Sequence, residues 1–126
     1  MSLQAPLARV LGLGSAREGS GHWWAQRLTA VGLVPLTLWF AASIVGMDLA
    51  GHETVSAWIR QPAHAIGLIL LVLTLVYHSA LGAQVVIEDY VHGAAGIVTL
   101  IGVRFVHVVL AIAGVYSVIV ISVRAL

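Results

Sequence analysis

His78 has the greatest capacity for chemistry in this chain, because it lies within a long apolar stretch, His64–Ile87. An imidazole in hydrocarbon must find partners for its ring nitrogens, since an unsatisfied polar group there costs about 2 kcal/mol or more. Gly82 follows four residues later and shares the helix face of His78 without adding bulk. An imidazole beside a small residue suits axial ligation of haem iron, because the flat macrocycle needs room. From its position alone, a hydrogen bond to a neighbouring helix is an equally strong interpretation of His78.

A six-coordinate haem needs a second axial ligand, and His107 is the internal candidate. His64 lies at the far end of the same apolar stretch and His22 precedes the first one, so neither matches the depth of His78. His107 follows Arg104 by three residues, which indicates a position nearer the membrane surface. A hydrogen-bonded core residue is the favoured interpretation of His107. A second ligand is therefore expected from a partner subunit.

An acid and a phenol, Asp89 and Tyr90, close the apolar stretch that contains His78. Asp89 follows His78 by eleven residues, about three turns and roughly 16 Å along a continuous helix. The simpler interpretation is a solvated helix end with a tyrosine at the membrane interface. The functional interpretation is a phenol that donates a hydrogen bond to a quinone carbonyl and is positioned by the neighbouring carboxylate.

A short arm before the first apolar stretch carries Trp23 and Trp24, which suit an anchor at the membrane surface or a contact with a peripheral protein. Arg27 ends the arm. It either snorkels to lipid phosphates or forms an ion pair with a haem propionate, for which its planar guanidinium is suited. His22 is a weaker candidate for the same role.

The composition excludes a water-soluble domain. The chain has 126 residues, 60% of them hydrophobic and only 9% charged, with a mean hydropathy of +1.03. Soluble domains carry about 25% charged residues. A net charge of +1 without any lysine argues against nucleic acid as a partner. The absence of cysteine excludes disulfides and thiolate-ligated metal sites within the chain.

Hydropathy predicts an all-α membrane protein with three transmembrane helices and an N-terminal extramembrane arm, forming one domain over residues 1–126. Each apolar segment has the length of about 20 residues that is needed to cross a bilayer. The arm covers residues 1–27, and the spans are Leu28–Gly46, His64–Ile87 and Val103–Val123. Pro35 falls within the first span, where we expect a kink.

Two connections join the predicted spans. The first, Asp48–Pro62, contains Trp58 and Ile59 in a short amphipathic segment, and Pro62 marks the start of the second helix. The second is a short linker centred on Glu88–Gly96.

The distribution of arginine predicts the orientation. Three arginines precede the first span and one begins the third on the same side, whereas two fall on the opposite side: Arg9, Arg17, Arg27 and Arg104 against Arg60 and Arg124. Four against two predicts a cytoplasmic N-terminus, which places Asp89 and Tyr90 on the cytoplasmic face.

Two blocks of sequence resemble the hydrophobic membrane anchor (D) subunit of succinate dehydrogenase, or succinate:quinone oxidoreductase, of the alphaproteobacterial type. The first is Gly19–Ala30, with the letters GSGHWWAQRLTA. The second is His-x-x-x-Gly at His78 and Gly82, followed by Asp89 and Tyr90. This spacing is fairly specific on the second of three spans, and the similarity covers most of the chain.

The resemblance implies a role in a four-subunit complex of the bacterial inner membrane. His78 would be one axial ligand of haem b, with the other from the cytochrome b (C) subunit. Tyr90, with Asp89 beside it, would donate a hydrogen bond to ubiquinone, and Arg27 with His22 would lie near the haem propionates. The flavoprotein and iron–sulfur subunits would dock on the cytoplasmic face. The chain would thus be a subunit of an enzyme, in a bundle shared with its partners, without a succinate site of its own.

Three alternatives remain open. The chain is a fumarate reductase anchor, a self-contained b-type cytochrome that uses His78 and His107, or a purely structural anchor or transporter subunit. Haem retention by the isolated chain favours the second, and the absence of haem from the purified protein favours the third.

Overall fold

The described part of the chain is helical throughout its regular structure. A computed structural model describes residues 17–47, 49 and 51–124. The helices are α2 (Arg17–Ile44), α3 (His52–Arg60), α4 (Pro62–Tyr90) and α5 (Gly93–Val123). Three of them are long and apolar enough to span a membrane: Ser20–Ile44, Pro62–Tyr90 and Gly93–Val123. The predicted all-α class with three spanning helices is confirmed.

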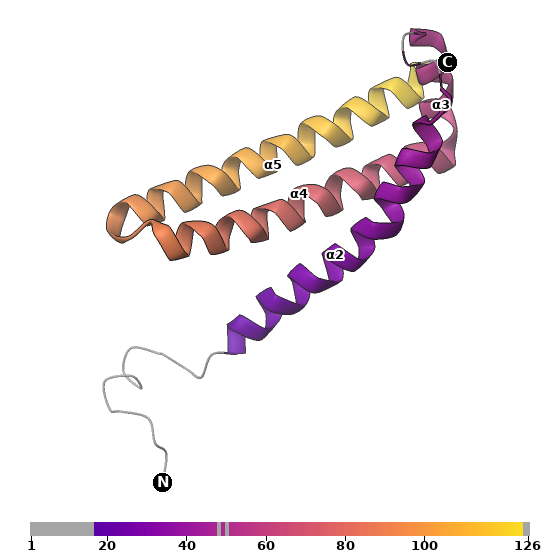
Figure 1. Cartoon of the computed structure of the whole chain (residues 1–126). Coiled ribbons are helices and arrows are strands. Elements are labelled where there is room, and N and C mark those ends of the chain that lie inside the picture. The colour runs from indigo at the N-terminus through magenta and orange to yellow at the C-terminus, as the bar shows by residue number, and fades with distance from the viewer. Residues whose placement is uncertain (1–16, 48, 50, 125–126) are drawn as a thin grey trace, which may run out of the picture.

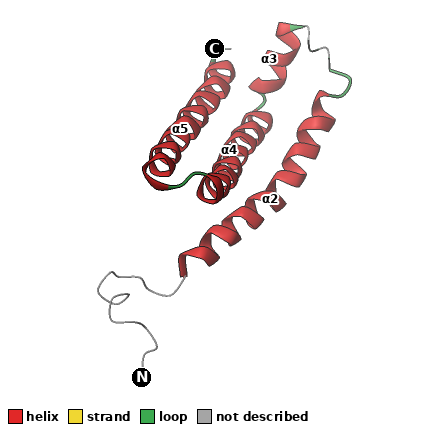
Figure 2. Cartoon of the chain, turned by 60° about the vertical axis from the view of Figure 1, so that its left-hand side comes forward, coloured by secondary structure: helices red, strands yellow, loops and turns green. Residues whose placement is uncertain are grey.

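The long helices pack as a layer with α4 in the middle. α4 lies between α2 and α5 in both views (Figure 1, Figure 2) and packs against each of them, whereas the backbones of α2 and α5 do not approach each other within the described segments. The short helix α3 packs against α4 and α5 near the C-terminus (Figure 1). The start of α2 and the α4–α5 connection lie toward the opposite end.

Helix α2 begins earlier than the first predicted span. It starts at Arg17, so Trp23, Trp24 and Arg27, which were assigned to the arm, are helical residues. Hydropathy missed the first part of α2 because Ser20–Arg27 is polar, while backbone hydrogen bonding does not depend on side-chain polarity. The helix is continuous through Pro35. The rest of the predicted arm, residues 1–16, lies outside the described residues.

Helix α5 also begins ten residues before the predicted third span. The predicted linker Glu88–Gly96 is reduced to the connection Val91–His92, since α4 continues to Tyr90 and α5 starts at Gly93. Gly93 has a φ of +69°, a backbone conformation that glycine adopts without a steric penalty, where the chain reverses into α5. The expected start of α4 at Pro62 is confirmed, because proline lacks the N–H that a first helical residue does not need.

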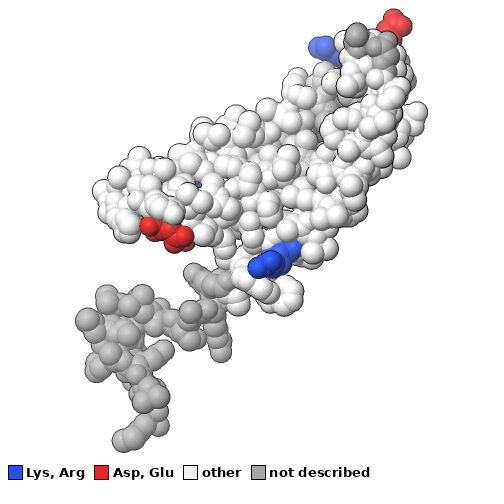
Figure 3. Space-filling model, in the orientation of Figure 1, with Lys and Arg blue, Asp and Glu red and all other residues white. Residues whose placement is uncertain are grey.

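The described residues form almost no hydrophobic core of their own. Their buried apolar side chains are Leu68, Leu71, Leu81, Ile87 and Val118, whereas large apolar residues such as Leu28 and Phe105 are exposed. Figure 3 shows the charged residues of this face mainly near the two ends of the helices, with an uncharged surface between them. In water such a surface would not be stable, so lipid or partner helices must cover it.

Glycine permits the close approach of α2 to α4 at the end nearer α3. A Cβ at Gly67 would lie 2.5 Å from the Trp39 ring of α2. Trp39 in turn stacks on Trp58 of α3, with ring centroids 5.8 Å apart, and Trp58 stacks on His64 at 4.3 Å. His64 therefore belongs to an aromatic cluster at this end and lies far from His78.

Candidate functional site

The His78 ring lies between α4 and α2 and contacts two polar side chains of α2. Its Nδ1 is 2.9 Å from Thr29 Oγ1, and its Nε2 is 3.4 Å from Gln26 Nε2. Thr29 donates its own hydroxyl proton to the carbonyl oxygen of Ala25, at 2.7 Å. The two contacts of His78 cross from α4 to α2, so the packing of these helices fixes the orientation of the imidazole.

These partners favour one tautomer of His78. With the Thr29 hydroxyl proton assigned to a backbone carbonyl, Thr29 Oγ1 is free to accept a hydrogen bond from a His78 ring that is protonated on Nδ1. In the neutral ring Nε2 then holds a lone pair. The amide of Gln26 is its protein contact, at the long end of the hydrogen-bond range.

The surroundings of Nε2 fit a metal-ligating imidazole. A neutral histidine that donates Nδ1–H to an oxygen acceptor is typical of a metal ligand, because that hydrogen bond orients the ring and raises its basicity. A Cβ at Gly82 would meet Gln26 Nε2 at 3.7 Å, so the Gln26 side chain lies over Gly82 and beside Nε2 of His78. Gln26 Oε1 is buried without a partner among the described residues. The imidazole can ligate haem iron through Nε2 once the Gln26 amide is displaced.

His78 and His107 face different neighbours. His107 donates Nδ1–H to the carbonyl oxygen of Val103 at 2.7 Å, and its Nε2 lies 3.0 Å from the Ser79 hydroxyl. Ser79 points about 100° around the helix from His78. The structure therefore places one ring at the α2–α4 interface and the other between α5 and α4. This arrangement supports the interpretation of His107 as a hydrogen-bonded core residue and gives no support to a haem held by both rings.

The two predicted propionate residues, His22 and Arg27, lie in different surroundings. The Nε2 of His22 is buried and has no partner among the described residues. The guanidinium of Arg27 is exposed and lies over the Trp23 ring, 5.4 Å from its centroid. Both lie within two turns of Gln26 on α2, and their roles toward a propionate stay predictions.

Asp89 and Tyr90 are the last two residues of α4. Both are exposed, and the Tyr90 side chain is 80% accessible. Neither forms a hydrogen bond to another described residue, so the chain alone does not position the phenol. If Tyr90 binds a quinone, partner subunits must supply the remaining walls of that site.

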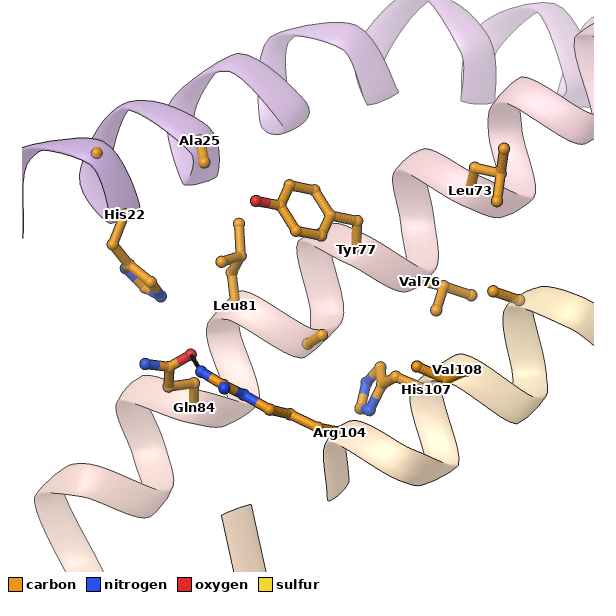
Figure 4. Close-up of a pocket in the computed structure, with 13 residues that line it drawn as sticks. His22, Ala25, Leu73, Val76, Tyr77, Leu81, Gln84, Arg104, His107 and Val108 are labelled. Carbon is orange, nitrogen blue, oxygen red and sulfur yellow. Dashed lines mark hydrogen bonds between the residues drawn. The ribbon is translucent and has the colours of Figure 1, made fainter. Parts of the chain in front are cut away.

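A groove bounded by α2, α4 and α5 was not predicted. It has a volume of about 620 Å³, and its lining includes His22, Tyr77, Leu81, Gln84, Arg104 and His107 (Figure 4). We call it the three-helix groove. Gln84, in the apolar span near its Tyr90 end, was the sequence signal, because an amide at that depth needs partners.

A hydrogen-bonded row of three side chains starts in this groove and continues along α4. Arg104 Nη2 donates to Gln84 Oε1 at 2.9 Å, and Gln84 Nε2 donates to Glu88 Oε1 at 2.7 Å. Gln84 thereby bridges a cation on α5 and a carboxylate on α4. The described residues offer no group of three or more His, Cys, Asp or Glu that could hold an ion alone.

The fold and site together define a multi-pass helical membrane protein with an oriented imidazole between two of its spans. The family model described as succinate dehydrogenase/fumarate reductase transmembrane subunit matches residues 1–120. The chain therefore belongs to this family, and the predicted resemblance is confirmed.

Curated relatives carry the name of a membrane anchor. The hydrophobic membrane anchor subunit of succinate dehydrogenase from Rickettsia bellii is 36% identical over 88 residues, covering 70% of each chain. The subunit of the same name from Paracoccus denitrificans is 33% identical over 88 residues, covering 70% of this chain and 68% of that one. No solved structure matches the chain.

Proposed function

We propose that this chain is the membrane anchor subunit of a succinate:ubiquinone oxidoreductase, that it binds haem b through His78, and that it forms part of the ubiquinone reduction site at Tyr90. The observation that carries the haem part is the 2.9 Å contact of His78 Nδ1 with Thr29 Oγ1, which favours a proton on Nδ1 and leaves a lone pair on Nε2 for iron. The names of the relatives support the anchor part.

Within this proposal four residues of the chain have roles in haem binding. His78 supplies one axial nitrogen, Thr29 orients the ring, and the cytochrome b subunit supplies the second ligand. When bound, the haem supplies a one-electron redox centre inside the membrane. The buried Nε2 of His22 and the guanidinium of Arg27 are hydrogen-bonding groups available to its propionates.

The quinone site is proposed at the end of α4. The Tyr90 hydroxyl is a hydrogen-bond donor at the membrane surface, and Asp89 beside it is exposed. A quinone takes up two protons with two electrons, and this end of α4 is accessible to water. Electrons reach it from succinate by way of the flavoprotein and iron–sulfur subunits, which dock at the end bearing the start of α2 and Val91–His92.

An optical and kinetic experiment on the complex purified from its bacterial inner membrane tests both parts. His78→Ala should abolish or shift the b-type signal in the reduced-minus-oxidised spectrum, whereas His107→Ala should leave it unchanged. Tyr90→Phe should reduce quinone reductase activity by roughly 10-fold or more through loss of one donor, while succinate oxidation with a soluble acceptor continues.

Each part can fail separately. A b-type signal that survives in His78→Ala would remove His78 as a ligand. Unchanged quinone turnover in Tyr90→Phe would remove the phenol from the quinone site. An anchor of a fumarate reductase is the second candidate, since the family description covers both directions of the reaction.

A further inference from the structure

The three-helix groove has the shape and size of a binding site for an amphiphile. Its volume of about 620 Å³ lies within the range of about 300–1,000 Å³ that is usual for small-molecule sites. It opens on the face of α4 that carries Tyr77 and Gln84, whereas His78 and Gly82 face α2. The groove is thus distinct from the proposed haem ligand.

Three polar residues of the groove lie toward one end. His22, Gln84 and Arg104 lie at this end in Figure 4, Tyr77 and His107 lie nearer the middle, and Leu73 lines the groove farther along α4. Leu73 precedes Gln84 by eleven residues, which is about 16 Å along α4. The polar end is the one nearer Tyr90, the end of the span, and the apolar end extends toward the middle of the membrane.

Arg104 carries a charge that the chain does not fully compensate. It is the twelfth residue of α5, about 17 Å from the helix start, and it lies where the predicted third span begins, so its backbone is close to the membrane surface. The acceptor it reaches is the neutral amide oxygen of Gln84, at 2.9 Å. A guanidinium has further N–H donors, and none contacts a carboxylate among the described residues.

The direction of the Arg104 side chain indicates what completes the site. Contacts between α4 and α5 pair His107 with Ser79, so Arg104 lies roughly opposite Gly82. Its guanidinium reaches Gln84 instead, which lies two residues nearer the Tyr90 end of α4 than Gly82 does. This direction is expected of an arginine that snorkels toward phosphates. Arginine binds phosphate through strong, charge-assisted hydrogen bonds.

We propose that the three-helix groove binds an anionic phospholipid, with the phosphate on Arg104 and an acyl chain along Leu73, Val76 and Val108. A cation with free donors at the headgroup end favours an anion over a neutral quinone ring or an apolar partner helix. The proposal does not depend on haem or quinone binding.

Lipid retention by the purified protein tests the proposal. The chain, with the subunits that accompany it, is placed in nanodiscs of phosphatidylcholine with a minority of phosphatidylglycerol, and the lipids that survive re-extraction are identified by native mass spectrometry. Phosphatidylglycerol should be enriched several-fold in the wild type and in Arg124→Gln, whose arginine lies at the other end of α5. Arg104→Gln should lose the enrichment.

A second variant separates loss of the site from loss of the fold. Ala80 lines the groove, so Ala80→Phe should fill it and abolish retention while every charge is kept. Equal enrichment in wild type, Arg104→Gln and Ala80→Phe would overturn the proposal, as would no preference for phosphatidylglycerol in the wild type. Release of a copurified subunit by Ala80→Phe without a change in lipid would assign the groove to a partner helix instead.

Discussion

Thr29 is the residue on which the chemistry of His78 depends. It is a weak helix former in an apolar helix, and its hydroxyl satisfies two needs: it bonds back to Ala25 and accepts the Nδ1–H of His78. A threonine at this position therefore positions the imidazole. It does not touch a reacting group itself.

Replacing Thr29 by the isosteric valine should leave His78 Nδ1–H without an acceptor. The unsatisfied group costs about 1–3 kcal/mol, and the ring becomes a less basic ligand. If His78 binds haem, retention after detergent washing should fall by about 10–100-fold or the midpoint potential should rise. Redox titration of the b-type signal measures the second effect.

Thr37→Val is the matched control. Thr37 lies on the same helix and bonds back to Leu33 at 2.7 Å, with no contact to a histidine. A Thr29→Val protein that titrates and retains haem as the Thr37→Val protein does would show that Thr29 has no role toward the ligand.

At the scale of the helices, α4 is the element that organises the chain. Its residues His78 and Gly82 face α2, and other residues of α4 line the three-helix groove. Asp89 and Tyr90 lie at its C-terminal end. Its contact with α2 depends on a missing side chain, since the Trp39 ring lies where a Cβ of residue 67 would be. In a membrane, where apolar burial gives little drive, such close packing holds helices together.

Gly67→Ala should therefore weaken the packing of α2 on α4. A methyl group 2.5 Å from the Trp39 ring forces the ring or the helix to move, and overpacking of this kind costs about 1–3 kcal/mol. Thermal unfolding in detergent, followed by tryptophan fluorescence, measures the change. Gly102→Ala is the control, because a Cβ there meets nothing within 4 Å among the described residues. Equal stability of the two variants would show that the contact is not required.

At the scale of the whole molecule, three spans place the start of α2 and the end of α5 on opposite sides of the membrane. The Val91–His92 connection lies on the side of the α2 start, and α3 lies on the other. The positive-inside rule predicts that the first of these sides faces the cytoplasm.

Cysteine labelling tests this orientation, because the natural chain has no cysteine. His92→Cys should react with a membrane-impermeant maleimide in inverted vesicles, and Thr54→Cys of α3 should react in intact cells. Both side chains are exposed. The reverse pattern would invert the topology, and labelling of both variants from one side would contradict the number of spans.

The sequence by itself determined the class of the protein, the existence of three spans and the helix that carries His78. These features depend on composition and local spacing, which a single chain displays directly. It did not locate the starts of α2 and α5, because hydropathy marks the part of a helix in hydrocarbon, while backbone hydrogen bonding extends the helix beyond that part.

Only the tertiary structure decided which groups meet across the helices. Thr29 and His78 are 49 residues apart, and Gln84 and Arg104 are 20 apart on two helices. His78 and His107, which both lie in apolar spans, face different helices. The rotation of each helix about its own axis is set by packing contacts such as that of Trp39 on Gly67. No local pattern encodes that rotation, so the tautomer of His78 and the three-helix groove emerge only from the folded chain.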